Sequence, residues 1–302
     1  MTALRQDADP DRPVTDAGVP ITTRRAERTL RGMVFGPEDG TPVLFIAGAA
    51  TGASMRFGEE LLEREGIRLL TMSRPGMAGS DEDPARTLDS TVQDYRALVE
   101  EVLGPDAEPL PVVANSQGGV FGLGAALSGW ASSLVLVSPA DEVAFPPIRS
   151  LLPSEATALS VLAEEDPEAA ATILGAYTAE AMEAMVLGGA HPSDHAVYAE
   201  PDFLALYRRS LAEGFADGGS GYVRDTLIAM RPWSLALEDL DVPVTILFGE
   251  RDAGHSPDLG LTLAARIPTA RRTVVPEAGG ALLWTHPQLV LEALAPQTCG
   301  SR

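Results

Sequence analysis

The sequence predicts an α/β fold built on a mostly parallel β-sheet, and three observations support this prediction. Short apolar runs alternate with helix-like segments along most of the chain, which is typical of strands joined by crossover helices. Several of these runs are continuously apolar, as expected for strands that are buried on both faces of a parallel sheet. One long interval, residues 145–237, is rich in Ala and Glu and contains no convincing strand. We therefore expect a mostly parallel sheet with helices on both faces and an inserted helical cap.

The apolar runs also give the order of the elements. The expected strands are residues 30–35, 43–46, 67–72, 110–114, 134–137, 242–248 and 272–275. Residues 90–93, Ser-Thr-Val-Gln, form a capping-box pattern, and the apolar residues that follow recur on one helical face until Gly104 ends the helix. The expected domain boundaries are a flexible tail at 1–18, a core at 19–144 and 238–298, and the cap at 145–237.

The composition favours a protein that acts on small molecules. A chain of 302 residues with 45% hydrophobic residues can bury one large core. The 22 basic and 43 acidic residues give a net charge of −21, which repels phosphate backbones and anionic lipid, so no nucleic-acid or membrane partner is expected. The single cysteine, Cys299, cannot form an intrachain disulfide, and no signal segment or membrane-spanning run is visible. The expected location is the cytoplasm.

A candidate nucleophile directly follows one of the buried strands. Residues 114–118, Ala-Asn-Ser-Gln-Gly, place Ser116 between small residues where a strand runs into a helix, which is the pattern of a nucleophile elbow. The backbone of such a turn is strained, so its neighbours must be small, and Gly118 lets the following helix approach the sheet. Asn115 lies next to Ser116 and is expected to face the same pocket.

Two further segments complete the candidate site. The strand at 43–46 ends in small residues that include Gly48 and Ala49, and backbone N–H groups exposed at such an edge can bind a developing oxyanion. We assign this role to the N–H groups of Ala49 and Gln117. Asp252 follows another strand at its carboxyl end, where the ligand sites of parallel sheets gather, and could orient a histidine.

The cap supplies candidates for the pocket wall. Met182, Met185 and Trp233 are placed to line a pocket, although ordinary helix packing explains any one of them as well.

Taken together, these motifs resemble the α/β-hydrolase superfamily, and in particular its bacterial members with a helical cap. Residues 74–81 are similar to the family's Arg-Pro-Gly-x-Gly-x-Ser-Asp loop, and residues 47–49 take the place of its His-Gly-x oxyanion loop. Ser116 matches the family's nucleophile and Asp252 its acid, in the family's chain order. The resemblance implies the α/β-hydrolase fold, with a mostly parallel, eight-stranded sheet, over nearly the whole chain beyond the tail.

The sequence departs from the family where the catalytic histidine should stand. The family's last motif has Gly-His, then six residues, then Pro, and counting back from Pro287 places its histidine at Gly280. Allowing one deletion moves it to Ala281. Neither residue can accept a proton, and a serine hydroxyl is a poor nucleophile without an adjacent base.

The remaining histidines and one acid are candidates for the missing role. His255, three residues after Asp252, is the candidate replacement base because it should face the same crevice. His286 precedes an expected helix start, which favours a surface role. His191 and His195 have the spacing of a metal pair but lack a third ligand, so no metal site is expected. Asp141, just after the expected strand at 134–137, is an alternative acid position in this superfamily.

Three functions are compatible with an incomplete triad. The first is a cofactor-independent enzyme that uses the oxyanion hole and the Ser116 region for non-hydrolytic carbonyl or enolate chemistry, such as C–C bond formation, cleavage or rearrangement. Its substrate would be a small, largely apolar carbonyl compound, with natural-product pathways suggested only by fold-level analogy. The second is a serine hydrolase acting on an ester, thioester or C–C bond, with an unusual or experimentally removed base. The third is a non-catalytic ligand-binding protein. No cofactor is expected, and a homodimer is compatible with the sequence.

Overall fold

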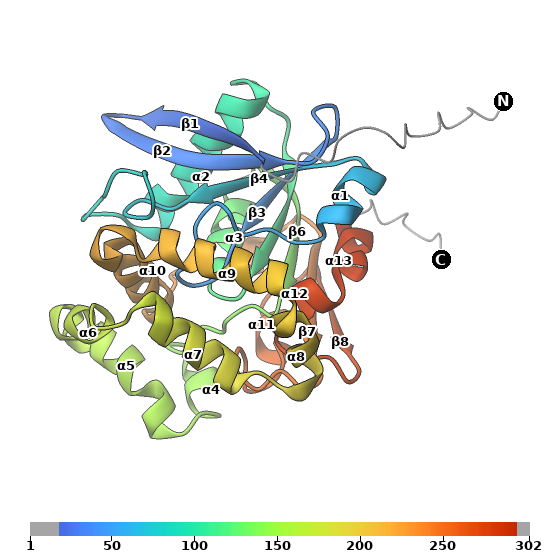
Figure 1. Cartoon of the computed structure of the whole chain (residues 1–302). Coiled ribbons are helices and arrows are strands. Elements are labelled where there is room, and N and C mark those ends of the chain that lie inside the picture. The colour runs from blue at the N-terminus through green and yellow to red at the C-terminus, as the bar shows by residue number, and fades with distance from the viewer. Residues whose placement is uncertain (1–17, 295–302) are drawn as a thin grey trace.

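The centre of the structure is a single β-sheet, which the computed structural model describes together with its surroundings for residues 18–294. The eight strands lie in the order β1-β2-β4-β3-β5-β6-β7-β8 (Figure 1). Their bounds are β1 Val19–Arg25, β2 Arg28–Phe35, β3 Thr41–Ile46, β4 Ile67–Ser73, β5 Leu110–Asn115, β6 Ala131–Val137, β7 Val244–Gly249 and β8 Ala270–Val275. Strand β2 pairs antiparallel with β1 and β4, and the remaining pairs are parallel. The expected fold class is confirmed.

Side chains of the central strands alternate between two apolar layers. In β3, Leu44 and Ile46 belong to one buried cluster, while Val43 and Phe45 belong to the other. Helices complete both layers. The first layer contains residues of α2 (Leu88–Leu103), α3 (Gly118–Leu127) and α11 (Leu261–Ala265), and the second contains residues of α1 (Glu59–Glu65), α12 (Leu282–Thr285) and α13 (Pro287–Leu294). Strands buried on both faces are therefore the reason for the continuously apolar runs.

Between β6 and β7 the chain forms helices without adding a strand to the sheet. The elements are α4 Pro146–Arg149, α5 Ser154–Glu165, α6 Pro167–Leu174, α7 Ala179–Gly189, η1 Pro192–Asp194, α8 His195–Ala199, α9 Pro201–Gly214, η2 Ala216–Gly219, α10 Ser220–Met230 and η3 Leu237–Asp239. Helices α4 to α10 lie together on one side of the core (Figure 1). We refer to α4–α10 as the cap.

The cap is fastened to the segment that follows β3. Gly52 N donates to Ser210 O on α9 at 3.0 Å, and Ser54 N donates to Glu213 Oε2 at 2.9 Å. Gly214, the last residue of α9, lies so close that an added Cβ would be 1.8 Å from the carbonyl oxygen of Ala50. Helix α9 therefore packs directly against the backbone of the segment that follows β3.

Two local expectations need correction. Strand β1 was not expected because it pairs only with β2 at the edge of the sheet, so its residues alternate between buried and exposed and form no apolar run. The capping box of α2 lies three residues earlier than predicted. Thr87 Oγ1 accepts from Ser90 N at 3.1 Å, and Ser90 Oγ accepts from Thr87 N at 2.9 Å, so Ser90 occupies the third helical position instead of the cap. Gly104 ends α2 as predicted.

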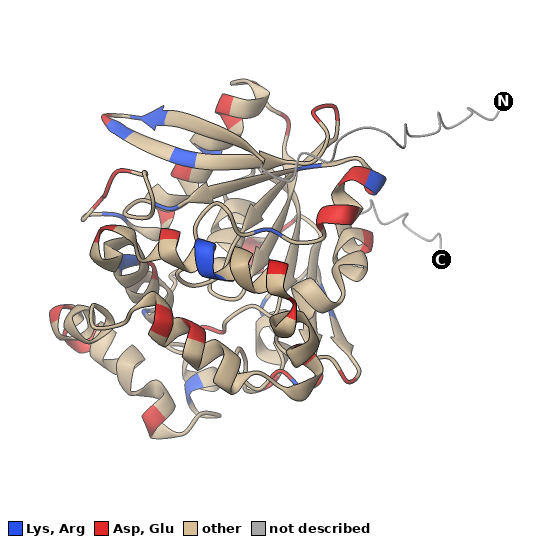
Figure 2. Ribbon diagram, in the orientation of Figure 1, with Lys and Arg blue, Asp and Glu red and all other residues tan. Residues whose placement is uncertain are grey.

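The surface charge is broadly distributed. Asp and Glu residues occur along helices of both the core and the cap (Figure 2). No helix within residues 18–294 combines the length and apolarity needed to cross a bilayer. Cys299 and residues 1–17 of the expected tail lie outside the described part of the chain.

The contact at Gly214 gives a stability prediction. Gly214→Ala should lower the free energy of unfolding by about 1–3 kcal/mol, because the new methyl group meets a backbone carbonyl that cannot yield freely. The matched control is Gly188→Ala, in an exposed part of α7 where an added Cβ meets nothing within 4 Å. That change should stabilise by up to about 1 kcal/mol through helix propensity. Thermal unfolding measures both, and equal shifts for the two variants would contradict the close approach.

Candidate active site

Ser116 lies in a strained turn at the carboxyl end of β5. Its φ of 52° is in the left-handed region, which is uncommon for a residue other than glycine. Its neighbours leave little room: a Cβ on Gly48 would be 3.1 Å from Ser116 Cβ, and one on Gly118 would be 2.4 Å from Ile46 O. The small residues of the predicted elbow are thus required by close contact between the β3 and β5 loops.

Two backbone N–H groups, one in the Ser116 turn and one in the turn after β3, are available to bind a ligand. Gln117 N precedes α3, where helical N–H groups have no intrahelical acceptor, and Ala49 N lies in the turn after β3. Within the described chain neither N–H donates to a protein acceptor. Both residues line the same cavity as Ser116.

Asp252 and His255 form a hydrogen-bonded pair in the loop after β7. The His255 Nδ1 lies 2.9 and 3.0 Å from the two carboxylate oxygens of Asp252. Gly254 N and His255 N also donate to Asp252 Oδ1, at 3.1 and 3.3 Å. Burial alone would raise the pKa of Asp252, but the hydrogen bond and charge of His255 help to hold this pKa below its ordinary value. A carboxylate only accepts, so Nδ1 carries the proton and Nε2 is left as the basic nitrogen.

The imidazole of His255 fills the space beside Gly280. A Cβ on Gly280 would be 3.2 Å from His255 Cε1 and 3.3 Å from both His255 Nδ1 and Asp252 Oδ1. The position from which the resemblance expects a histidine thus faces a histidine that arrives from the neighbouring loop.

The other side of the same loop is occupied by a cap carboxylate. Asp194 Oδ2 accepts from Ala281 N at 3.2 Å, and a Cβ on Gly279 would be only 2.2 Å from this oxygen. Asp194 is 2% exposed and comes from η1. No motif in the sequence indicated its role, because it comes from a cap segment whose path over the core cannot be derived from local pattern.

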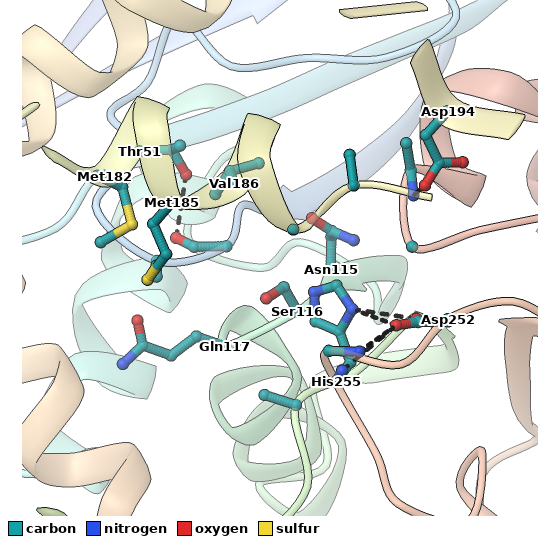
Figure 3. A pocket seen from close by; sticks show the side chains of 18 of the residues that line it. Thr51, Asn115, Ser116, Gln117, Met182, Met185, Val186, Asp194, Asp252 and His255 are labelled. Atoms are coloured by element: carbon teal, nitrogen blue, oxygen red, sulfur yellow. Dashed lines mark hydrogen bonds and ion pairs between the residues drawn. The ribbon is translucent and has the colours of Figure 1, made fainter. Parts of the chain in front are cut away.

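Figure 3 shows how Ser116 and His255 lie relative to each other. The ring nitrogen of His255 that is not bonded to Asp252 is on the side of Ser116, while the Ser116 hydroxyl is turned away from the ring. Across residues 18–294 no hydrogen bond joins the two side chains. Rotation about the Ser116 Cα–Cβ bond moves the hydroxyl between staggered positions, and catalytic hydrogen bonds are often incomplete without substrate.

The cavity above Ser116 has a volume of about 550 Å³ and mostly apolar walls. Cap side chains of Met182, Met185 and Val186 contribute to it, as seen in Figure 3, together with aromatic rings from Tyr198 and Trp284. The sequence predicts Met182 and Met185 in the wall of this cavity, but it does not predict the two aromatic rings.

Two of the predicted pocket residues lie in different settings. Asn115 lines the cavity, and its Nδ2 donates to Val137 O at 2.9 Å. Trp233 does not line it. Its side chain is 6% exposed, packs in the apolar layer that contains α2 and α3, and donates from Nε1 to Ala229 O at 2.9 Å. The expectation for Trp233 is therefore corrected: Trp233 follows α10 and packs in the core instead of lining the cavity.

Comparison with known proteins identifies the family. The sequence matches the alpha/beta hydrolase family over residues 43–293. The chain belongs to this family. The predicted resemblance to the α/β-hydrolase superfamily is thus confirmed. No curated protein is similar enough in sequence to match this α/β-hydrolase chain.

Solved structures support the same α/β-hydrolase fold. An alpha/beta hydrolase fold protein from Nakamurella multipartita is 19% identical, with a TM-score of 0.64, and the match covers 91% of this chain and 98% of that one. A hydrolase from Pseudomonas aeruginosa PA01 is 19% identical, with a TM-score of 0.66 and coverage of 93% and 100%. An enol-lactonase from Burkholderia xenovorans LB400 is 18% identical, with a TM-score of 0.64 and coverage of 89% and 97%. At these identities the likeness concerns the fold alone.

One further acid of this α/β-hydrolase chain lines the cavity. Asp141 is 6% exposed, follows β6, and its Oδ2 has no hydrogen-bond partner among the described residues. The pKa of Asp141 is raised to about 6, chiefly by burial; the charge of Asp258 also raises this pKa, while the hydrogen bond of Ser256 and the charge of Arg266 lower it. For metal binding, no group of three His, Cys, Asp or Glu side chains in the described ranges is arranged to hold an ion.

The raised pKa of Asp141 predicts a pH-dependent cost to stability. Because the folded state binds this proton more tightly than the unfolded state, the cost is absent below about pH 4, grows as pH rises to about 6, and then stays constant at no more than about 3 kcal/mol. Asp141→Asn should therefore raise the thermal midpoint near pH 8 and leave it unchanged near pH 4.

The control for this experiment is Asp106→Asn, which changes an exposed acid. Thermal unfolding of both variants at the two pH values measures the effect. A stabilisation by Asp141→Asn of equal size at both pH values would contradict the burial of an ionised carboxylate.

Proposed function

We propose that this α/β-hydrolase chain is a serine hydrolase that cleaves an ester or lactone of a small, largely apolar acyl compound, with His255 as its base. The observation that carries the proposal is the Asp252–His255 pair, whose imidazole fills the space beside Gly280. Of the three functions that the sequence left open, hydrolysis is the one that requires a base next to the nucleophile, and this pair supplies it.

The proposed reaction follows from these groups. Ser116 Oγ attacks the substrate carbonyl carbon while its proton passes to His255 Nε2, and the carbonyl electron pair moves to oxygen. The N–H groups of Ala49 and Gln117 stabilise this oxyanion. The carbonyl re-forms, the C–O bond to the leaving group breaks, and His255 returns the proton to the departing alkoxide. Water then attacks the acyl-enzyme by the same steps, releasing the acid and regenerating Ser116.

The loop after β7 is suited to orient the base by itself. Asp252 accepts the backbone N–H groups of Gly254 and His255, so the carboxylate closes a tight turn that aims the imidazole. The negative charge of Asp252 stabilises the imidazolium that forms when Ser116 is deprotonated. Both functions of the acid are thus local to the turn from Asp252 to His255, and the β8 loop contributes only the space beside Gly280.

The cavity favours an uncharged, largely apolar acyl group. Most side chains of its cap wall are Met, Val, Ala and Tyr, and the polar ones are His191, Asp194 and Thr226. Among the described residues that line the cavity, Arg251 is the one arginine. Its Nη2 lies 3.0 Å from Glu277 Oε1, so its charge is paired. Several proteins of similar fold are named as esterase or lactonase, which agrees with the proposed class of bond. The non-hydrolytic chemistry that the sequence first suggested stays a prediction.

The first test measures hydrolysis directly. The wild-type protein should hydrolyse p-nitrophenyl butyrate and should be labelled at Ser116 by a fluorophosphonate. His255→Ala should lower kcat by about 10³-fold or more, as loss of a triad member does elsewhere. His286→Ala, outside the cavity, should keep wild-type kcat. A wild-type protein that neither turns over short esters nor is labelled would reject the hydrolase.

The second test concerns the space beside Gly280. Gly280→Ala should lower kcat by about tenfold at an unchanged thermal midpoint, because the methyl group displaces the imidazole of His255. Gly280→His in the His255→Ala background should recover part of the lost activity, since Asp252 lies within reach of both positions. Gly188→Ala is the matched control for a glycine-to-alanine change. Full activity of Gly280→Ala would show that the packing of His255 against Gly280 has no part in the reaction.

A further inference from the structure

Two buried arginines meet one buried carboxylate at the boundary between core and cap. Arg74 follows β4, Arg86 precedes α2, and Asp225 lies on α10. Arg74 Nε pairs with Asp225 Oδ2, and Arg86 Nη1 lies 2.6 Å from Asp225 Oδ1. All three side chains are fully buried. Removing charges from water is costly, so such a cluster persists only where its geometry is closely defined.

The two arginines differ in what else they contact. Arg74 Nη1 donates to Ala47 O at 3.0 Å and Arg74 Nη2 donates to Gly48 O at 2.8 Å. Arg86 Nη2 instead donates to Gly221 O within the cap, at 3.2 Å. Only Arg74 therefore joins Asp225 to the loop that carries the Ala49 N–H.

The peptide group between Gly48 and Ala49 transmits this contact. In a trans peptide the carbonyl oxygen and the N–H point in opposite directions. The oxygen of this group is held by Arg74 Nη2 and by Thr51 Oγ1, at 2.8 and 3.0 Å. Because the oxygen is held on the buried side, the Ala49 N–H points in the opposite direction. Ala49 lines the same cavity as Ser116, so this direction favours an N–H that faces the cavity.

The charge of Arg74 reinforces the donor. Burial alone would lower the pKa of Arg74, but Asp225 and Tyr95 raise it above its ordinary value, so the guanidinium stays charged. Its planar fork is also kept in place by the ring of Phe121, 5.4 Å away. A positive charge behind the carbonyl increases the polarity of the peptide group and strengthens the N–H as a donor to an anion.

We propose that Arg74 is a positioning residue that aims and polarises the Ala49 N–H, and that Asp225 of the cap holds Arg74 in that pose. This inference rests on the proposed hydrolase function for its catalytic consequence. It makes the cap a part of the machinery that binds the oxyanion, in addition to its role as a pocket wall.

The test compares Arg74→Lys with Arg86→Lys, a matched pair because both residues contact Asp225. Arg74→Lys should lower kcat for p-nitrophenyl butyrate by about ten- to a hundredfold, less than the full loss of one oxyanion donor, with KM within about twofold. The inhibition constant of a trifluoromethyl ketone, which forms a tetrahedral oxyanion on serine, should rise by the same factor. Arg86→Lys should keep kcat and the inhibition constant even where its thermal midpoint falls. Equal kcat losses in the two variants would overturn the proposal.

A variant without buried charge keeps the test independent of folding. Thr51→Val removes the second hydrogen bond to Gly48 O and should lower kcat by about three- to tenfold at the wild-type thermal midpoint. An unchanged kcat in Thr51→Val, together with an unchanged kcat in a folded Arg74→Lys, would also overturn the proposal.

An NMR measurement separates this inference from the proposed function. The amide resonance of Ala49 should shift in Arg74→Lys and stay in place in Arg86→Lys. A wild-type protein without ester turnover that still gives this pattern would reject the hydrolase but support the positioning by Arg74. Ester turnover in the wild type, combined with no shift in Arg74→Lys, would support the hydrolase and reject the positioning.

Discussion

The left-handed backbone of Ser116 is the constraint on which the rest of the site depends. This conformation lets the chain leave β5 and enter α3 within two residues, and it brings the β3 loop to within van der Waals contact of the serine. The strain is supported from both sides, since Ser116 N donates to Val137 O and Ser116 O accepts from Gly119 N and Ala140 N. A turn fixed in this way gives the neighbouring loops, with the Ala49 and Gln117 amides and the His255 imidazole, a defined position around Ser116.

Much of this arrangement follows from sequence pattern, and the rest does not for physical reasons. Central strands such as β5 and β6 are apolar on both faces, so they are visible as runs, whereas β1 at the edge is half-exposed and is not. Ser116 and Asp252 are found because parallel strands bring their carboxyl ends to one edge. Asp194 is invisible to such reasoning because its position depends on how the cap folds over the core, and no local period encodes that contact.

The proposed base, His255, and Gly280 lie on two neighbouring loops that share one acid. Strands β7 and β8 are parallel neighbours, and their loops remain in contact where Arg251 N donates to Ala278 O at 2.8 Å. An imidazole from either loop can therefore reach Asp252. The imidazole of His255 occupies the space beside position 280, which glycine leaves open. The sequence makes His255 a candidate for the missing role, and the structure adds the reason that it fits: Gly280 has no side chain to displace the ring.

A continuous set of contacts joins the cap helices that line the cavity to the turn that carries Ala49. Helix α7 provides Met182 and Met185 to the cavity wall, and Glu183 on the same helix is paired with Arg208 on α9 at 2.7 Å. Helix α9 in turn is bonded through Glu213 to Ser54, in the chain that follows the Ala49 turn. Helix α9 therefore ties the cap to the chain after the Ala49 turn, while Arg74 holds the carbonyl oxygens of Ala47 and Gly48 before it. Arg74 is in turn paired with Asp225 on α10. The turn that carries the Ala49 N–H thus has contacts on both sides that lead to cap helices.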